Sequence, residues 1–199
     1  MSRLGFGAKP VVLRCSRCGR FVDWEEARLQ VACGCRTKLE LPPVLVRDAT
    51  AADRAAAIAL IRRDFGQTSI VSFGEPVSLD GAPILAASMK GELAGALAYR
   101  LLPDALQILA LATDPMWQRT GVGGHLVAEA EAVARSRGLG RIILATTNDN
   151  LPALYFYQRR NYLVTALVPG AILPHLKVSS SGGFGGIPIR DEIRLEKKL

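Results

Sequence analysis

The stretch that decides the fold is Gln118-Arg119-Thr120-Gly121-Val122-Gly123-Gly124, a glycine-rich turn past the middle of a chain of 199 residues. It follows an apolar run at residues 108–112 and leads into a segment with helical periodicity. Strand, glycine-rich turn and helix in this order point the free N–H groups of the first helical turn at an anion. Because glycine has no Cβ atom, a diphosphate can approach the backbone closely. The stretch therefore predicts a phosphate-binding turn.

Two common phosphate-binding motifs do not fit this turn. A P-loop closes with Gly-Lys-Ser/Thr, whereas His125 and Leu126 follow Gly124 here. The dinucleotide fingerprint GxGxxG needs a third glycine, and Leu126 occupies that position. That fingerprint also belongs to the first strand–helix unit of its domain. A glycine-rich turn without a ligand is the alternative that this stretch alone leaves open.

A family resemblance explains the turn better. Gln118-x-x-Gly121-x-Gly123, after a strand that ends near Asp114-Pro115, resembles the acetyl-CoA pyrophosphate loop of the GNAT N-acetyltransferases. Downstream, Asn150-Leu-Pro-Ala153-Leu-Tyr-Phe-Tyr157 resembles the family's Asn-x-x-Ala-x-x-x-Tyr motif, and Asn161-Tyr162 stands where the family has Gly-Phe. The two motifs lie at the separation that the family shows, and the resemblance covers residues 44–199.

The order of the apolar segments predicts an α/β (α+β) fold: a mixed, mainly antiparallel sheet of the GNAT type, flanked by helices. Thr50 is expected to cap the first helix, and residues 65–81 are expected to form loops. The expected core face of the first helix is Ala55, Ile58, Ala59 and Ile61. We expect strands at residues 44–50, 83–88, 92–101, 105–113, 140–146, 162–168 and 191–197, and helices at residues 51–63, after Gly124, and at 151–160.

The resemblance implies a site for acetyl-CoA where two neighbouring strands splay apart. The amine attacks the thioester directly in a ternary complex. Tyr157 is implied to protonate the leaving thiolate, and a backbone N–H of Ala112, or of Leu111, to stabilise the oxyanion. Tyr155, on another helix face, is the weaker candidate. The implied cofactor-binding residues are Leu111, Ala112, Thr113, Gln118, Arg119, Thr120, Gly121, Val122, Gly123, Gly124, Asn150, Ala153 and Tyr157.

The base and the acceptor are not identified by the sequence. The candidates for the base are His175, Glu75, Asp80 and Asp104, but each is more simply a surface residue, and water can carry the proton away. His125, in the first turn of the helix after the glycine-rich turn, is expected to be a neighbour of the phosphates or simply exposed rather than a base. The acceptor is a primary amine of a small molecule or a protein, since fold and motif do not choose among them. A non-catalytic acyl-CoA-binding module is the alternative function.

All four cysteines lie within the first 35 residues, as Cys15-Ser-Arg-Cys18 and Cys33-Gly-Cys35. Four thiolates in two close pairs suit a tetrahedral Zn²⁺ site, which is structural because no coordination position stays open. We predict a zinc ribbon with short strands around residues 21–24 and 29–32, and hence two units, residues 1–42 and 43–199. Two disulfides are the alternative, but the N-terminus carries no secretion signal that would support an oxidising compartment.

The net charge of +7 suits anionic partners such as the phosphates of CoA. Lys and Arg are scattered, with no dense run beyond Lys197-Lys198, so nucleic acid is not the expected partner. Only the ribbon is a candidate for such binding, as an adaptor for nucleic acid or protein. No apolar stretch is long enough to span a membrane, so we expect a cytoplasmic protein; a homodimer is compatible with the sequence.

Overall fold

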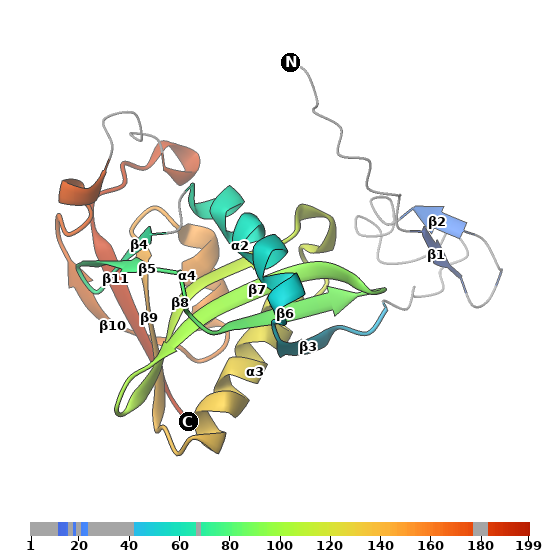
Figure 1. Ribbon diagram of the computed structural model, residues 1–199. Coiled ribbons are helices and arrows are strands. Elements are labelled where there is room, and N and C mark those ends of the chain that lie inside the picture. The colour runs from blue at the N-terminus through green and yellow to red at the C-terminus, as the bar shows by residue number, and fades with distance from the viewer. Residues whose placement is uncertain (1–11, 16–17, 19–20, 24–41, 67–68, 177–182) are drawn as a thin grey trace.

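The structure, a computed structural model, describes residues 12–15, 18, 21–23, 42–66, 69–176 and 183–199. Its centre is a seven-stranded sheet with the order β10-β11-β9-β8-β7-β6-β3 (Figure 1). The neighbours β8 and β9 run parallel, and the other neighbouring pairs run antiparallel. This confirms the predicted mixed, mainly antiparallel sheet. Its strands are β3 (Leu45–Asp48), β6 (Ile84–Met89), β7 (Glu92–Leu101), β8 (Ala105–Thr113), β9 (Arg141–Thr147), β10 (Leu163–Val168) and β11 (Glu192–Lys198).

Helices α2 (Ala51–Phe65) and α3 (Val122–Ser136) pack on opposite faces of the sheet. Successive strand residues point to opposite faces, so each strand contributes to two cores. Ala96, Ala98 and Ala112 pack with α2 in one core, and Leu85 and Leu97 pack with α3 in the other. A third helix, α4 (Leu151–Gln158), follows β9 and supplies Tyr157 to the α3 core.

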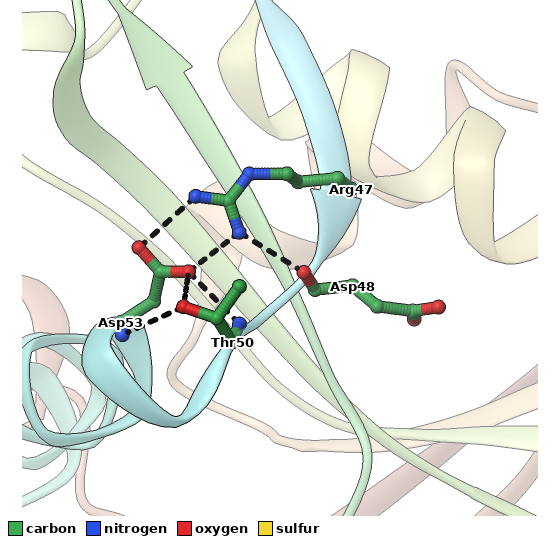
Figure 2. A network of polar contacts seen from close by, with 4 residues as sticks. All are labelled: Arg47, Asp48, Thr50 and Asp53. Carbon is green, nitrogen blue, oxygen red and sulfur yellow. Dashed lines mark hydrogen bonds and ion pairs between the residues drawn. The ribbon is translucent and has the colours of Figure 1, made fainter.

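The start of α2 is fixed by a polar network (Figure 2). As predicted, Thr50 caps the helix: its hydroxyl accepts from the Asp53 N–H at 3.3 Å, and Asp53 accepts from the Thr50 N–H at 2.8 Å. Arg47 on β3 binds both carboxylate oxygens of Asp53. Hydrogen bonding to Arg47, and then to Thr50, holds the pKa of Asp53 well below its ordinary value.

The predicted core face of α2 is confirmed only at Ile61 and, in part, at Ile58. The buried residues are Ala57, Leu60 and Ile61, whereas Ala55 and Ala59 are exposed and Ile58 is half-buried. The segment is so rich in alanine that several helical stripes are equally apolar in the sequence. Burial follows the stripe that carries the larger side chains Leu60 and Ile61, because they remove more apolar surface from water.

The prediction of loops at residues 65–81 is wrong, because this segment contains a hairpin of β4 (Ser69–Ser72) and β5 (Glu75–Ser78). Phe73 and Gly74 connect the strands, both with positive φ (58° and 78°), as in the tight turns that favour hairpins. The Gly74 N–H donates to Glu192 on β11 at 3.1 Å. Ser72 accepts from the buried amide of Gln107 on β8 at 2.8 Å. Each strand has only four residues, too few to show a clear alternating pattern.

The N-terminal segment is described in part. Strands β1 (Val12–Arg14) and β2 (Phe21–Asp23) pair antiparallel, and the connection between them contains Cys15 and Cys18. The strand predicted near residue 21 is confirmed, whereas Cys33, Cys35 and the strand predicted at residues 29–32 lie outside the described residues. Within the described part, no three His, Cys, Asp or Glu side chains group as metal ligands. The four-cysteine zinc ribbon therefore stays a prediction.

None of the helices in the described ranges is both long enough and apolar enough to cross a membrane.

Candidate functional site

Strands β8 and β9 separate towards their carboxyl ends. They pair from Ala105 opposite Arg141 to Ile108 opposite Leu144, and not beyond. Past that point β8 stays paired with β7 up to Thr113, and β9 stays paired with β11 up to Thr147. A cavity of about 1100 Å³ opens here, lined by Leu111 and Thr113 on one strand and by Ala145 and Thr147 on the other.

The register of β8 shows which of its backbone groups face this cavity. Asp114 N–H donates to Ala94 O on the β7 side at 2.9 Å. Hydrogen-bonded pairs alternate along an antiparallel ladder, so Ala112, opposite Ala96, also turns its N–H and C=O towards β7. Leu111 and Thr113 point their backbone N–H and C=O groups away from β7, towards β9. Leu111 and Thr113 line the cavity, whereas Ala112 is buried against α2 and is not among the lining residues.

The glycine-rich turn connects β8 to α3 as predicted. Asp114 caps a short 3₁₀ turn, η1 (Pro115–Trp117), by accepting from the Met116 N–H at 2.9 Å. Gly121 then begins α3 with a φ of +97°, a conformation that side chains disfavour. The lining of the cavity includes Gln118, Arg119, Gly121, Val122, Gly123 and Gly124.

Thr120 lies in the turn but is not among the residues that line the cavity. Its hydroxyl is buried and donates to the carbonyl of Trp117 at 2.6 Å. This bond stabilises the turn from inside, so Thr120 shapes the loop rather than facing a ligand.

Two glycines of the turn allow α4 to approach α3. A Cβ atom at Gly123 would lie 3.3 Å from the ring of Phe156, and one at Gly124 would lie 2.9 Å from Nη2 of Arg160. The Arg160 guanidinium stacks on the Phe156 ring, 3.7 Å from its centroid, and donates to the Phe156 carbonyl at 2.9 Å. These glycines therefore make room for a ring and a cation beside the first turn of α3.

Arg160 is a site residue that the sequence analysis missed. It lies two residues past the end of α4 and lines the cavity together with Ala153, Phe156 and Tyr157 of that helix. The i, i+3, i+4, i+7 spacing of these four residues was the available signal, since the sequence predicted a helix up to residue 160. Within the described ranges Arg160 forms no ion pair with a carboxylate. Its charge, the exposed Arg119 and the positive end of the α3 dipole meet at one end of the site.

Tyr157 is 6 % exposed and packs edge-on against Phe156 and Tyr162, with ring centroids 5.0 and 5.3 Å away. Its hydroxyl has no hydrogen-bond partner among the described residues. Among the described residues, every fully buried side-chain oxygen or nitrogen has a hydrogen-bond partner. Since the Tyr157 hydroxyl has none, it is not fully buried, and its accessible surface lies in the cavity that Tyr157 lines. Burial raises the pKa of Tyr157, and the nearby Arg160 opposes this only in part. The group therefore stays protonated.

The neighbouring candidates differ from Tyr157. Tyr155 is 65 % exposed and its hydroxyl accepts from Arg159 at 2.7 Å, on another face of α4. Asn150 caps α4, as predicted, by accepting from the Ala153 N–H at 3.2 Å. Both Asn150 and Ala153 line the cavity.

Of the four residues considered as a base, His175 alone is among the residues that line this cavity. Asp104 instead pairs with Arg141 at 2.7 Å, outside the cavity. Three carboxylates that the sequence analysis did not consider also line it: Asp64, Asp149 and Glu192.

The comparisons with known proteins agree with this geometry. A profile of the acetyltransferase (GNAT) family matches residues 75–162, which include both sequence motifs. The uncharacterized protein YxbD of Bacillus subtilis is 36% identical over 124 residues, which is 61% of this chain and 76% of that protein. The chain belongs to the GNAT acetyltransferase family. It is thus an acyltransferase, and the expected family is confirmed.

Two further similar proteins are acetyltransferases by name. The streptothricin acetyltransferase of Streptomyces lavendulae is 32% identical over 90 residues, 44% of this chain and 48% of that protein. A GNAT family acetyltransferase from Elizabethkingia anophelis, solved with acetyl-CoA bound, shares the fold with a TM-score of 0.63. It is 18% identical over 78% of this chain and 98% of that one.

Proposed function

We propose that the protein transfers the acetyl group of acetyl-CoA to a primary amine by direct attack in a ternary complex. The observation that carries this proposal is that one cavity joins three features. These are the unpaired backbone edge of β8 at Leu111 and Thr113, the glycine-rich start of α3, and the hydroxyl of Tyr157. The relative named streptothricin acetyltransferase and the structure of the same fold with acetyl-CoA bound support the choice of donor.

The cofactor would lie along this cavity from the diphosphate to the thioester. The N–H groups of the first turn of α3 have no partners within the helix and suit an anion. Gln118 and Arg119 add side-chain donors, and Arg160 adds a second cation. The pantetheine arm would then pair with the free backbone groups of Leu111 and the N–H of Thr113, as an added strand does. The Thr113 carbonyl already accepts from Arg63 at 3.3 Å.

The reaction would proceed without a covalent enzyme intermediate. The neutral amine attacks the thioester carbon, a C–N bond forms, and the carbonyl oxygen becomes an oxyanion. The free N–H of Leu111, rather than that of Ala112, is placed to stabilise it. The C–S bond then breaks, Tyr157 protonates the CoA thiolate, and the proton of the amine leaves through water.

Calorimetry with acetyl-CoA and an acetyl-transfer assay over several amine classes test this function. We expect binding of acetyl-CoA and transfer to at least one amine. A folded protein without any affinity for acetyl-CoA would refute the proposal, and binding without transfer to any amine would favour the acyl-CoA-binding module.

Substitution of Arg160 by methionine is expected to raise the Kd of CoA by about tenfold or more, since a hydrogen bond to a charged group contributes about 1.5–3 kcal/mol. Methionine keeps an unbranched side chain beside Phe156 and removes the charge. The measurement is calorimetry with CoA, and with acetyl-pantetheine, which lacks the diphosphate and should bind both forms equally. Arg159→Met is the matched control, because Arg159 binds the Tyr155 hydroxyl and is not among the cavity-lining residues.

We also propose that Cys15, Cys18, Cys33 and Cys35 bind one structural Zn²⁺ at the N-terminus. The hairpin of β1 and β2, with Cys15 and Cys18 in its connection, supports this proposal. Metal analysis should find about one zinc per chain, and Cys18→Ser should lose it, because a structural site needs all four ligands. Disulfides among these cysteines in protein kept reduced would contradict the site.

A further inference from the structure

The buried carboxylate of Asp149 is the unusual charged group of the cavity. Three carboxylates line this cavity, and two of them have a cationic partner: Asp64 pairs with Arg63 at 3.1 Å and Glu192 with Arg194 at 2.7 Å. Asp149 is 7 % exposed and forms no ion pair with any residue in the described part of the chain. A buried charge without a counterion is costly, so a cation that enters the cavity would gain by binding there.

The hydrogen bonds of Asp149 hold its carboxylate in place without neutralising it. The Thr147 hydroxyl donates to Oδ1 at 2.5 Å, and the Phe184 N–H donates to Oδ2 at 3.0 Å. Both donors are uncharged. A carboxylate can accept roughly four hydrogen bonds, so about half of its capacity is left for a ligand.

Part of the cavity wall is apolar. Ile70 and Val71 of β4 line the cavity, and so do Ile172, Leu176 and Ile189 from the connection between β10 and β11. Hydrogen bonds from Asn148, in the turn between β9 and α4, fasten the same connection. Asn148 Oδ1 accepts from the N–H groups of Arg190 and Asp191, each at 3.0 Å, and its amide donates to the Pro188 carbonyl at 3.0 Å. The turn that carries Asp149 thus also holds the connection that supplies Ile189.

Asp149 lies just before α4, whose N-cap is Asn150, and the proposed acid Tyr157 lies in the last turn of that helix. A group bound at Asp149 is therefore set apart from the amine that attacks the thioester. An alkyl chain between two amino groups would lie along the cavity, with its methylene groups against the isoleucine and leucine side chains that line it.

We propose that the acceptor is an aliphatic di- or polyamine, and that Asp149 binds the ammonium group that does not react. This inference rests on the proposed acetyltransferase function and specifies its acceptor. Asp149 acts here as a specificity-determining residue: it pairs with the distal cation, while the free amine at the other end attacks the acetyl group.

The test compares three four-carbon amines with the intact protein and acetyl-CoA: 1,4-diaminobutane, n-butylamine and 4-aminobutyrate. We expect kcat/KM for the diamine to exceed the values for the other two by about tenfold or more, since a tenfold ratio needs only about 1.4 kcal/mol. Asp149→Asn should raise the KM of the diamine by a similar factor. Its effect on the kcat/KM of n-butylamine should be much smaller, because that amine has no second ammonium group to pair with Asp149.

Asp191→Asn is the matched control. Asp191 is also buried, accepts from the Gly170 N–H at 2.9 Å and anchors the same connection, but it is not among the cavity-lining residues. Equal activity of the wild-type protein on the diamine and on n-butylamine would overturn the inference, and so would an equal loss on both amines in Asp149→Asn. If the wild-type protein binds no acetyl-CoA, the proposed function itself fails. The substrate series in the wild-type protein decides the question even if Asp149→Asn does not fold.

Discussion

Substitution of Tyr157 by phenylalanine is expected to lower kcat by about a hundredfold or more, the usual contribution of a general acid. The substitution removes only the hydroxyl that reaches the cavity. The ring keeps its edge-on contacts with Phe156 and Tyr162, so the fold and the Kd of acetyl-CoA should stay close to those of the wild-type protein. Steady-state kinetics and calorimetry on the same preparation separate the two effects.

Tyr155→Phe is the control for this experiment, because Tyr155 lies two residues earlier on the same helix with its hydroxyl bound to Arg159 at the surface. It should retain the wild-type kcat. A Tyr157→Phe protein with wild-type kcat would show that water or another group protonates the thiolate.

The raised pKa of Tyr157 predicts the pH dependence of this step. Burial disfavours the charged tyrosinate and moves the pKa above the ordinary value of 10.0. The protonated, proton-donating form therefore persists through neutral and mildly alkaline pH. In the wild-type protein, kcat should not fall between pH 7 and pH 9.5 through loss of this proton. A fall in that range that disappears in Tyr157→Phe would contradict the shifted pKa.

Substitution of Gly123 by leucine should raise the Kd of CoA by about a hundredfold or more, equivalent to about 2.7 kcal/mol. Even a Cβ atom at this position would lie 3.3 Å from the Phe156 ring. A longer side chain must displace that ring or extend into the space assigned to the diphosphate. Crowding of a packed site costs about 1–3 kcal/mol, so the melting temperature should also fall.

Gly140→Leu provides the comparison, because a Cβ atom at Gly140 meets nothing within 4 Å. It should keep the CoA affinity of the wild-type protein. Circular dichroism shows whether the Gly123→Leu protein is folded. A folded Gly123→Leu protein with wild-type affinity for CoA would show that the glycine-rich turn is not part of the CoA site.

The sequence was informative where local chemistry alone determines the structure. The cap of α2 by Thr50 follows from a polar side chain before a helical segment, and the turn at Gly121 follows from a backbone conformation that glycine favours. Tyr157 was found because a family motif fixes its position on α4. Its placement in the cavity agrees with that motif, while its catalytic role stays a proposal.

The remaining features depend on contacts between distant segments. The free backbone edge at Leu111, rather than Ala112, follows from the ladder register with β7, which a lone strand does not specify. Arg160 entered the site because Gly123 and Gly124 let α4 approach α3. Asp149 matters because strand separation opens a cavity beside it. Only Arg160 has a sequence signal, its helical spacing from Ala153, Phe156 and Tyr157; the other relations have no sequence spacing of their own.

The way Asn148 holds the connection between β10 and β11 bears on how such an enzyme could change its acceptor in evolution. All three bonds of its side chain go to backbone atoms of residues 188–191. The side chains of residues 188–190 take no part in these bonds and can vary without breaking them, whereas the Asp191 carboxylate is itself an anchor of the connection. Random mutation there could explore new acceptors while the catalytic helix and the donor site stay intact.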